Sequence, residues 1–136
     1  MSDILSSISI LVGILTALFS LFFPSIDEIL NLNSSSAGNR DNTLNYRRGK
    51  SVRNTKVFPL LFGAILLTIV FIPELINQLK IAWLVFRVNG NSIIWNTYDT
   101  ASAAYIVTSI FAITLTISIC YISFRFFVHL KTLRDY

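Results

Sequence analysis

An uncharged apolar run of twenty residues, Ile4–Phe23, constrains the fold of this chain more than any other feature. As an α-helix it would be about 30 Å long, which matches the hydrocarbon core of a bilayer. Two more apolar stretches follow, over 57–76 and 101–128. With 54% hydrophobic and only 13% charged residues, 136 residues could not bury this surface away from water. We predict an all-α membrane protein, a single domain over 1–136 with three transmembrane helices.

The connecting segment 25–56 predicts which way round these helices lie. Between Asn31 and Lys56 it contains one acidic residue, Asp41, and a cluster of basic ones: Arg40, Arg47, Arg48, Lys50, Arg53 and Lys56. Short loops rich in Lys and Arg remain on the cytoplasmic side of a membrane. The C-terminal residues Arg125, Lys131 and Arg134 repeat the signal. We therefore expect the N-terminus outside and the C-terminus in the cytoplasm, with the helices in a plasma membrane.

The basic residues within this connection are also candidates for contact with anionic lipid headgroups or with a cytoplasmic protein partner. Those proposed for contact are Arg47, Arg48, Lys50 and Arg53. The alternative is that they determine topology and do nothing more. Because such flanks account for the net charge of +4, nucleic-acid binding is disfavoured. Pro24 is expected to end or kink the first helix before a short amphipathic turn, and residues 31–43 are expected to be mobile.

Small residues recur along one face of the first span. They lie three and four positions apart, at Ser6, Ser9, Gly13, Thr16 and Ser20. Helix association in lipid depends on close packing and hydrogen bonds, and small residues allow both. The pattern predicts a helix-packing face, and a homo-oligomer is one way to use it.

A second polar stripe follows the third span. Its candidate pore-lining residues are Thr108, Ala112, Thr116 and Ser123, with Ser109 and Cys120 close to the same side. Such hydroxyls either bond neighbouring helices or face water in a pore, and both alternatives stay open. A three-span chain cannot enclose a pore alone, so conduction would require a symmetric oligomer.

The outer segment, 77–100, allows two interpretations. A second helix continuing to Val88 would be about 48 Å long, well beyond the bilayer core. Alternatively, Ile81–Val88 and Ser92–Trp95 could form a hairpin around Asn89-Gly90. We expect a helix that ends near Lys80, followed by a small extracytoplasmic cap. An outer aromatic belt is expected in either case, formed by Trp83, Trp95, Tyr98 and Tyr105.

The apolar runs contain little that could carry chemistry. Cys120 is the only cysteine and His129 the only histidine, so neither a disulfide within the chain nor a zinc site of two cysteines and two histidines can form. We expect Cys120 to be buried and structural, and Glu74, after Pro73, to lie solvated at the outer interface. We find no nucleophile–base pair, glycine-rich phosphate loop or metal cluster. The sequence therefore predicts no enzyme activity and no cofactor.

The order of these features resembles small bacterial membrane proteins of phage-exclusion and anti-phage systems. The segment SSISILVGILTALFSLFF, the basic loop, a second span ending in a carboxylate and a polar-striped last helix are similar to the last three spans of the membrane subunit of the Rex exclusion system. The Rex subunit has a preceding helix that this chain lacks. The resemblance implies an oligomeric effector that conducts ions or disturbs the inner membrane when infection is sensed through a cytoplasmic partner.

Two other functions fit the same sequence. One is a non-conducting accessory subunit of a larger membrane complex. The other is a bacteriocin-type immunity protein, for which the outer segment 81–98 would be the contact surface. Neither would require the chain to conduct ions.

Overall fold

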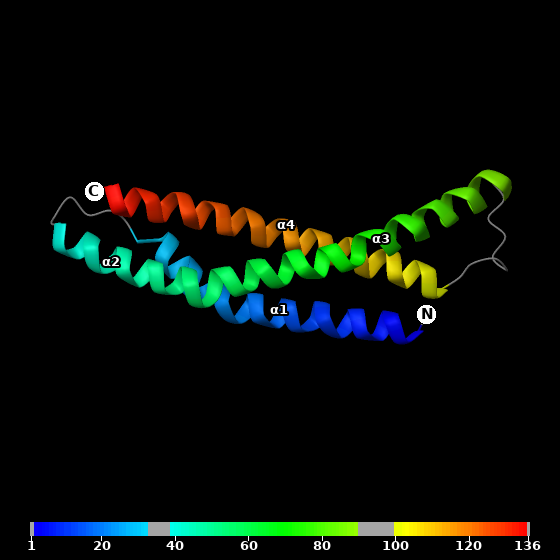
Figure 1. Ribbon diagram of the computed structural model, residues 1–136, viewed down its shortest axis with the longest axis horizontal. Coiled ribbons are helices and arrows are strands. Elements are labelled where there is room, and N and C mark those ends of the chain that lie inside the picture. Colours follow the sequence, from blue (N-terminus) through cyan, green and yellow to red (C-terminus); the bar gives the residue numbers. More distant parts are fainter. Residues whose placement is uncertain (1, 33–38, 90–99, 136) are drawn as a thin grey trace.

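Helices form all but Asn31 and Leu32 of the part described by the computed structural model, which comprises residues 2–32, 39–89 and 100–135. They are α1 (Ser2–Leu30), α2 (Asn39–Val52), the π-helical turn η1 (Arg53–Val57), α3 (Phe58–Asn89) and α4 (Thr100–Asp135). α1, α3 and α4 run side by side along the long axis, and α2 continues the line of α3 (Figure 1). The two termini lie at opposite ends of this bundle (Figure 1).

Three helical stretches are long and apolar enough to cross a membrane, as the sequence predicts. They cover Leu5–Leu30, Thr43–Val88 and Thr100–Arg134. Their outward faces carry large apolar side chains such as Leu21, Phe62 and Phe124, which are 65–68% exposed. Lipid rather than water is the solvent that such a surface suits.

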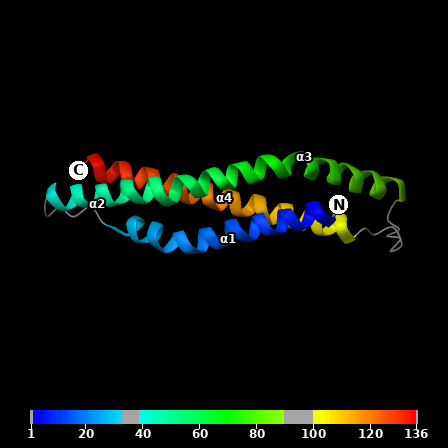
Figure 2. The same cartoon turned by 60° about the horizontal axis from the view of Figure 1, so that its bottom comes forward.

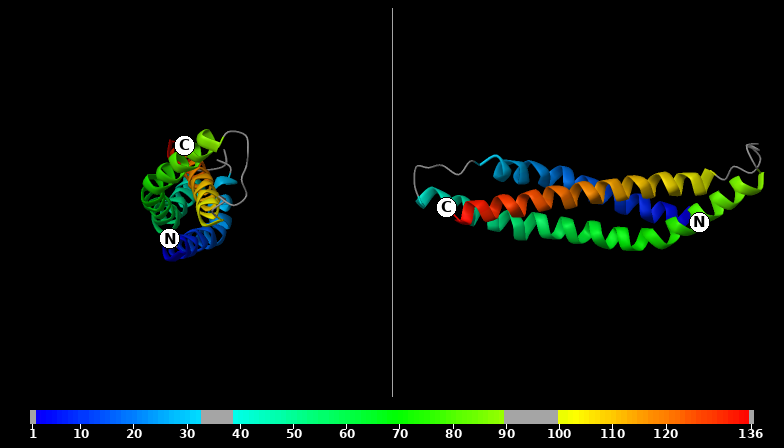
Figure 3. Two further views of the ribbon diagram at one scale, coloured as in Figure 1. Left: turned by 90° about the vertical axis from the view of Figure 1, so that its right-hand side faces the viewer. Right: turned by 90° about the horizontal axis from the view of Figure 1, so that it is seen from above.

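Each long helix turns one seam of side chains toward the other two. On α4 the buried residues alternate at spacings of four and three: Tyr105, Ser109, Ala112, Thr116, Ile119, Ser123, Phe126, Leu130 and Leu133. Ile8, Val12 and Leu15 begin the same spacing on α1. A repeat averaging 3.5 residues keeps a seam on one side of helices that cross at about 20°. The three helices therefore pack around a common axis, as the rotated views show (Figures 2 and 3).

α1 does not end at Pro24 but continues through it to Leu30. Proline removes one backbone donor and disfavours the interior of a helix. Here Ile26 and Ile29, in the last turns, are 2% and 1% exposed and pack with Val57, Phe126 and Leu130. Burial of these side chains stabilises the helix beyond the proline. The amphipathic character expected of this turn is present, since Asp27 and Glu28 are exposed.

The connection over 25–56 is largely helical rather than an irregular loop. Of the stretch 31–43 that was expected to be mobile, residues 39–43 already belong to α2, while 33–38 lie outside the described residues. α2 passes through η1 into α3, so that 39–89 forms one continuous helical segment. We name the end of the bundle that contains α2, the last turns of α1 and residues 125–134 the basic end.

The expectations for the outer segment were wrong where the structure describes it. α3 continues past Lys80 to Asn89, so Ile81–Val88 is helical and cannot be a hairpin strand. The rest of the proposed hairpin and cap, 90–99, lies outside the described residues, together with Trp95 and Tyr98. Every side chain from Ile81 to Val88 is exposed, and this part of α3 leaves the bundle in Figures 1 and 3. We name 81–88 the α3 extension.

One member of the predicted aromatic belt lies inside the bundle. Tyr105 is only 3% exposed, and its ring contacts that of Phe71 at a centroid distance of 6.2 Å. Position 105 belongs to the four–three repeat of α4, which decides its orientation. Trp83 is 67% exposed, with its ring 6.3 Å from that of Phe86.

Candidate functional site

The polar stripe of α4 lies inside the chain's own helix bundle. Ser109, Ala112, Thr116 and Ser123 are 0–7% exposed, whereas Thr108 is half-buried and bonds the carbonyl of Ala104 in its own helix. Within one chain the buried members contact neighbouring helices and do not face a lumen. Of the two alternatives open at the sequence level, this placement favours helix contact over pore lining.

A pair of threonine hydroxyls links α4 to α3. Thr68 Oγ1 lies 2.9 Å from Thr116 Oγ1, and each also lies 2.9 Å from the carbonyl oxygen four residues earlier in its own helix, Ala64 or Ala112. Thr116 Oγ1 is in addition 3.4 Å from the Ala64 carbonyl oxygen. Ala64 is fully buried, and its side chain is only a methyl group. Small side chains thus bring the helices close enough for their hydroxyls to meet.

The small-residue face of α1 points away from this interior. Ser6, Ser9, Gly13 and Ser20 are exposed, and Thr16 is half-buried with its hydroxyl bonded to the Val12 carbonyl. A Cβ added at Gly13 would meet nothing within 4 Å. α1 packs against α3 and α4 through its larger residues Ile8, Val12 and Leu15 instead. Its small-residue face therefore serves no contact among the described parts of this chain.

At the basic end, α2 packs closely over α1 and α4. Gly49 is buried, and a Cβ added there would lie 2.6 Å from Leu130 Cδ1 and 3.5 Å from Ile29 Cγ2. The absence of a side chain at this position lets the helices approach. Two polar contacts tie the same region to α1: Arg48 Nη2 donates to Glu28 Oε1 at 2.8 Å, and Lys56 Nζ donates to Ser25 Oγ at 2.5 Å.

The four basic residues predicted to contact lipid or a partner therefore differ in environment. Arg47 and Lys50 are exposed on α2, while Arg48 is held by Glu28. Arg53, in η1, is half-buried, and its guanidinium carbon lies 5.6 Å from the centre of the Phe58 ring. The sequence predicted one role for all four because it does not indicate which of them contact other residues at the basic end.

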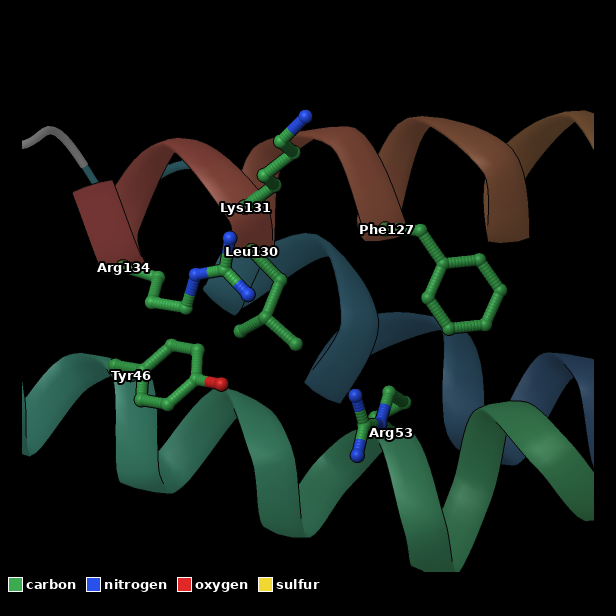
Figure 4. Close-up of a pocket in the computed structure, with 6 residues that line it drawn as sticks. All are labelled: Tyr46, Arg53, Phe127, Leu130, Lys131 and Arg134. Carbon is green, nitrogen blue, oxygen red and sulfur yellow. The ribbon is translucent and has the colours of Figure 1, made fainter.

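A cavity of about 280 Å³ opens between α2 and α4 at this end. Six residues line it: Tyr46, Arg53, Phe127, Leu130, Lys131 and Arg134. Figure 4 shows the Tyr46 hydroxyl and the guanidinium groups of Arg53 and Arg134 around the space between the two helices, with Leu130 reaching into it from α4. The Lys131 ammonium points away from the cavity in that view (Figure 4). Of these residues the sequence suggested only Arg53 as a contact, since the pairing of α2 with α4 was not predictable.

A third polar contact lies near the other end of α3. Gln78, which is 5% exposed, donates from Nε2 to Glu74 Oε1 at 2.7 Å. The carboxylate is half-buried and thus less solvated than we expected of it. This pair gives Glu74 a structural partner within its own helix.

Other reactive side chains are scattered. Cys120 is exposed on α4, so the expectation of a buried cysteine was wrong, because position 120 falls outside the buried repeat. His129 is half-buried, with no partner for Nε2 among the described residues. Within the same residues, no group of three or more His, Cys, Asp or Glu side chains could hold a metal ion.

Comparison with known proteins adds no relative. No protein family, curated protein or solved structure matches this chain.

Proposed function

We propose that this chain is a non-catalytic membrane protein that acts in an assembly, with the small-residue face of α1 as the assembly surface. The carrying observation is that Ser6, Ser9, Gly13 and Ser20 lie exposed on the outside of the bundle. Small residues in membrane helices permit the backbones of two helices to approach closely. The open space around Gly13 leaves room for a second helix there.

The most specific form of this proposal is an oligomeric inner-membrane effector of a bacterial anti-phage or phage-exclusion system. It would conduct ions or perturb the membrane once triggered through a cytoplasmic partner at the basic end. Its support is the resemblance in the order of spans and the concentration of cations on α2. Because Thr116 and Ser123 are buried within the chain, a conducting path would need to be lined by other groups, such as the exposed hydroxyls of α1.

A second candidate is a non-conducting accessory subunit of a larger membrane complex. The observation that favours it is the burial of Ser109, Thr116 and Ser123, since side chains packed between the helices of one chain give no water-filled path. In both candidates the small-residue face of α1 is the assembly surface. In the effector it contacts a second copy of this chain, and in the accessory subunit it contacts a helix of a different protein.

The native mass of the full chain in mild detergent, measured with any co-purifying proteins, tests assembly through α1. We expect the unmodified chain to assemble and Gly13→Leu to reduce the assembled fraction. Thr114→Leu is the matched control, because Thr114 is also exposed in a span and bonds only to a carbonyl of its own helix. Assembly that survives Gly13→Leu, or that is lost equally in the control, would sink the α1 assignment.

The partner and an ion-flux assay separate the two candidates. A closed multiple of 15.3 kDa that releases ions from liposomes supports the effector. A single copy embedded among larger membrane subunits, with no flux from liposomes, supports the accessory subunit. Restriction of phage growth in a host carrying the chain and its genomic neighbours tests the anti-phage role.

A further inference from the structure

The cavity at the basic end combines cations with an apolar wall. Arg53, Lys131 and Arg134 contribute positive charge, and none of the described residues that line the cavity is acidic. Arginine presents several donors in a fixed plane that matches the oxygens of a carboxylate or phosphate. The Tyr46 hydroxyl adds a neutral donor pointing into the same space (Figure 4). The arrangement suits an anion with several acceptor oxygens.

The position of Arg53 places this cavity beside the start of the apolar part of α3. Its guanidinium lies over the Phe58 ring, and the Phe58 ring is 5.7 Å from the ring of Phe127, which lines the cavity. Phe58 is 46% exposed at the first position of α3. Beyond Phe58, α3 is almost free of charge as far as Glu74. A ligand with its charged group in the cavity would therefore meet apolar surface on the membrane side.

The volume of the cavity limits what can enter. At about 280 Å³ it is at the lower limit of sites that hold small organic molecules. A phosphate with its ester substituent fits such a space. The charge and the size of the cavity together suit a small anionic group.

We propose that the cavity between α2 and α4 binds the phosphate group of an anionic ligand, held by Arg53 and Arg134 with the Tyr46 hydroxyl. The phosphate can belong to a phospholipid headgroup of the adjacent leaflet or to a soluble phosphate. Lys131 supplements the field from the rim, where its flexible stem lets the ammonium turn inward. This inference does not rest on assembly through α1, because the two surfaces involve different helix faces.

The test uses the full chain in nanodiscs of zwitterionic phosphatidylcholine, with and without phosphatidylglycerol. Native mass spectrometry counts retained phosphatidylglycerol, and inorganic phosphate added to the zwitterionic sample is followed by ³¹P NMR line broadening. Variants Arg53→Gln and Arg134→Gln are compared with Arg125→Gln, an exposed charge on α4 that does not line the cavity. We expect Arg53→Gln to lower the affinity about tenfold and Arg125→Gln to change it little.

Arg53→Lys separates the role of the site from a loss of folding. Lysine keeps the positive charge but not the planar donors of arginine. We therefore expect an affinity between those of the unmodified chain and Arg53→Gln, with an unchanged size-exclusion profile of the protein. Lipid retention that depends on Arg53 identifies a headgroup site, and Arg53-dependent broadening by inorganic phosphate identifies a soluble ligand. Equal losses in Arg53→Gln and Arg125→Gln, or binding of neither probe, would overturn the proposal. Retention of an acidic peptide in place of both probes would overturn it as well.

Discussion

The hydroxyl of Thr68 on α3 lies 2.9 Å from that of Thr116 on α4, in the middle of an otherwise apolar contact. Each hydroxyl has one hydrogen, so only two of the contacts around this pair are donated at one time. Hydrogen bonds between membrane helices stabilise them by about 0.6 kcal/mol on average and up to about 1.7 kcal/mol. The pair therefore contributes modestly to stability and more to the register of the two helices.

We predict a coupling free energy of about 0.5–1.5 kcal/mol between Thr68→Val and Thr116→Val in a double-mutant cycle. Valine keeps the shape and removes the hydrogen bond, and each remaining threonine can still bond to a carbonyl of its own helix. Unfolding in a detergent that denatures the bundle, followed by circular dichroism, gives the free energies. Thr114→Val with Thr68→Val is the control and should show no coupling. Coupling indistinguishable from that control would contradict the contact.

A second prediction concerns the close approach at Gly49. Overpacking a tight helix contact costs about 1–3 kcal/mol, and Gly49→Leu should destabilise the basic end by that amount because its side chain would overlap Leu130. Limited proteolysis within α2, together with the free energy of unfolding, measures the loss. Ser51→Leu, on the exposed side of α2, is the control for added apolar bulk. Adding Leu130→Ala to Gly49→Leu should restore part of the stability, and a double variant weaker than either single change would refute this packing.

The ion pair between Glu28 and Arg48 should matter much less than Gly49. Both side chains are more than half exposed, and exposed pairs contribute about 0.2–1 kcal/mol. We predict that Glu28→Gln lowers the free energy of unfolding by less than about 0.5 kcal/mol, with an effect that shrinks further in high salt. A loss above 2 kcal/mol would mean that the pair, and not the apolar packing around Ile29, holds α2 in place.

The sequence predicted the number and location of the membrane helices because uncharged length is a local property. It could not identify which faces meet, because in lipid the outside of a helix is as apolar as the inside. On α4 the buried seam mixes small or polar residues such as Ser109 and Thr116 with large apolar ones such as Phe126, and a strict four–three repeat from Tyr105 would have found it. On α1 the small residues lie on the outer face of the bundle, while Ile8 and Val12 face inward.

The basic end was harder to predict for a different reason. Its structure depends on contacts between segments far apart in the chain, such as Gly49 with Leu130 and Lys56 with Ser25. Composition alone describes α2 as polar and basic, which is typical of a solvated loop. The cavity lined by Tyr46 and Arg134 exists only because α2 packs along α4. No local sequence pattern predicts that contact between the two helices.

The α3 extension leads to the last prediction. Six large apolar side chains there are 43–77% exposed: Ile81, Trp83, Leu84, Val85, Phe86 and Val88. Removing each from water would be favourable by about 1.5–3 kcal/mol, so a fully aqueous position would be unfavourable. The 32 residues of α3 span about 48 Å, against about 30 Å for the hydrocarbon core. Tilt alone would have to exceed the usual range, so we expect the extension to lie in the membrane interface.

Trp83 reports on this position directly. In a Trp95→Phe background it is the only tryptophan, and its ring should emit at the shorter wavelengths of an interfacial indole. Lipids brominated near the headgroup should quench it more strongly than those brominated near the end of the acyl chain. Leu84→Gln should raise its accessibility to aqueous iodide, because a polar amide is less favourable than leucine against the acyl chains. Strong iodide quenching of the unmodified extension, with none by either lipid, would place it in water and contradict the interfacial position.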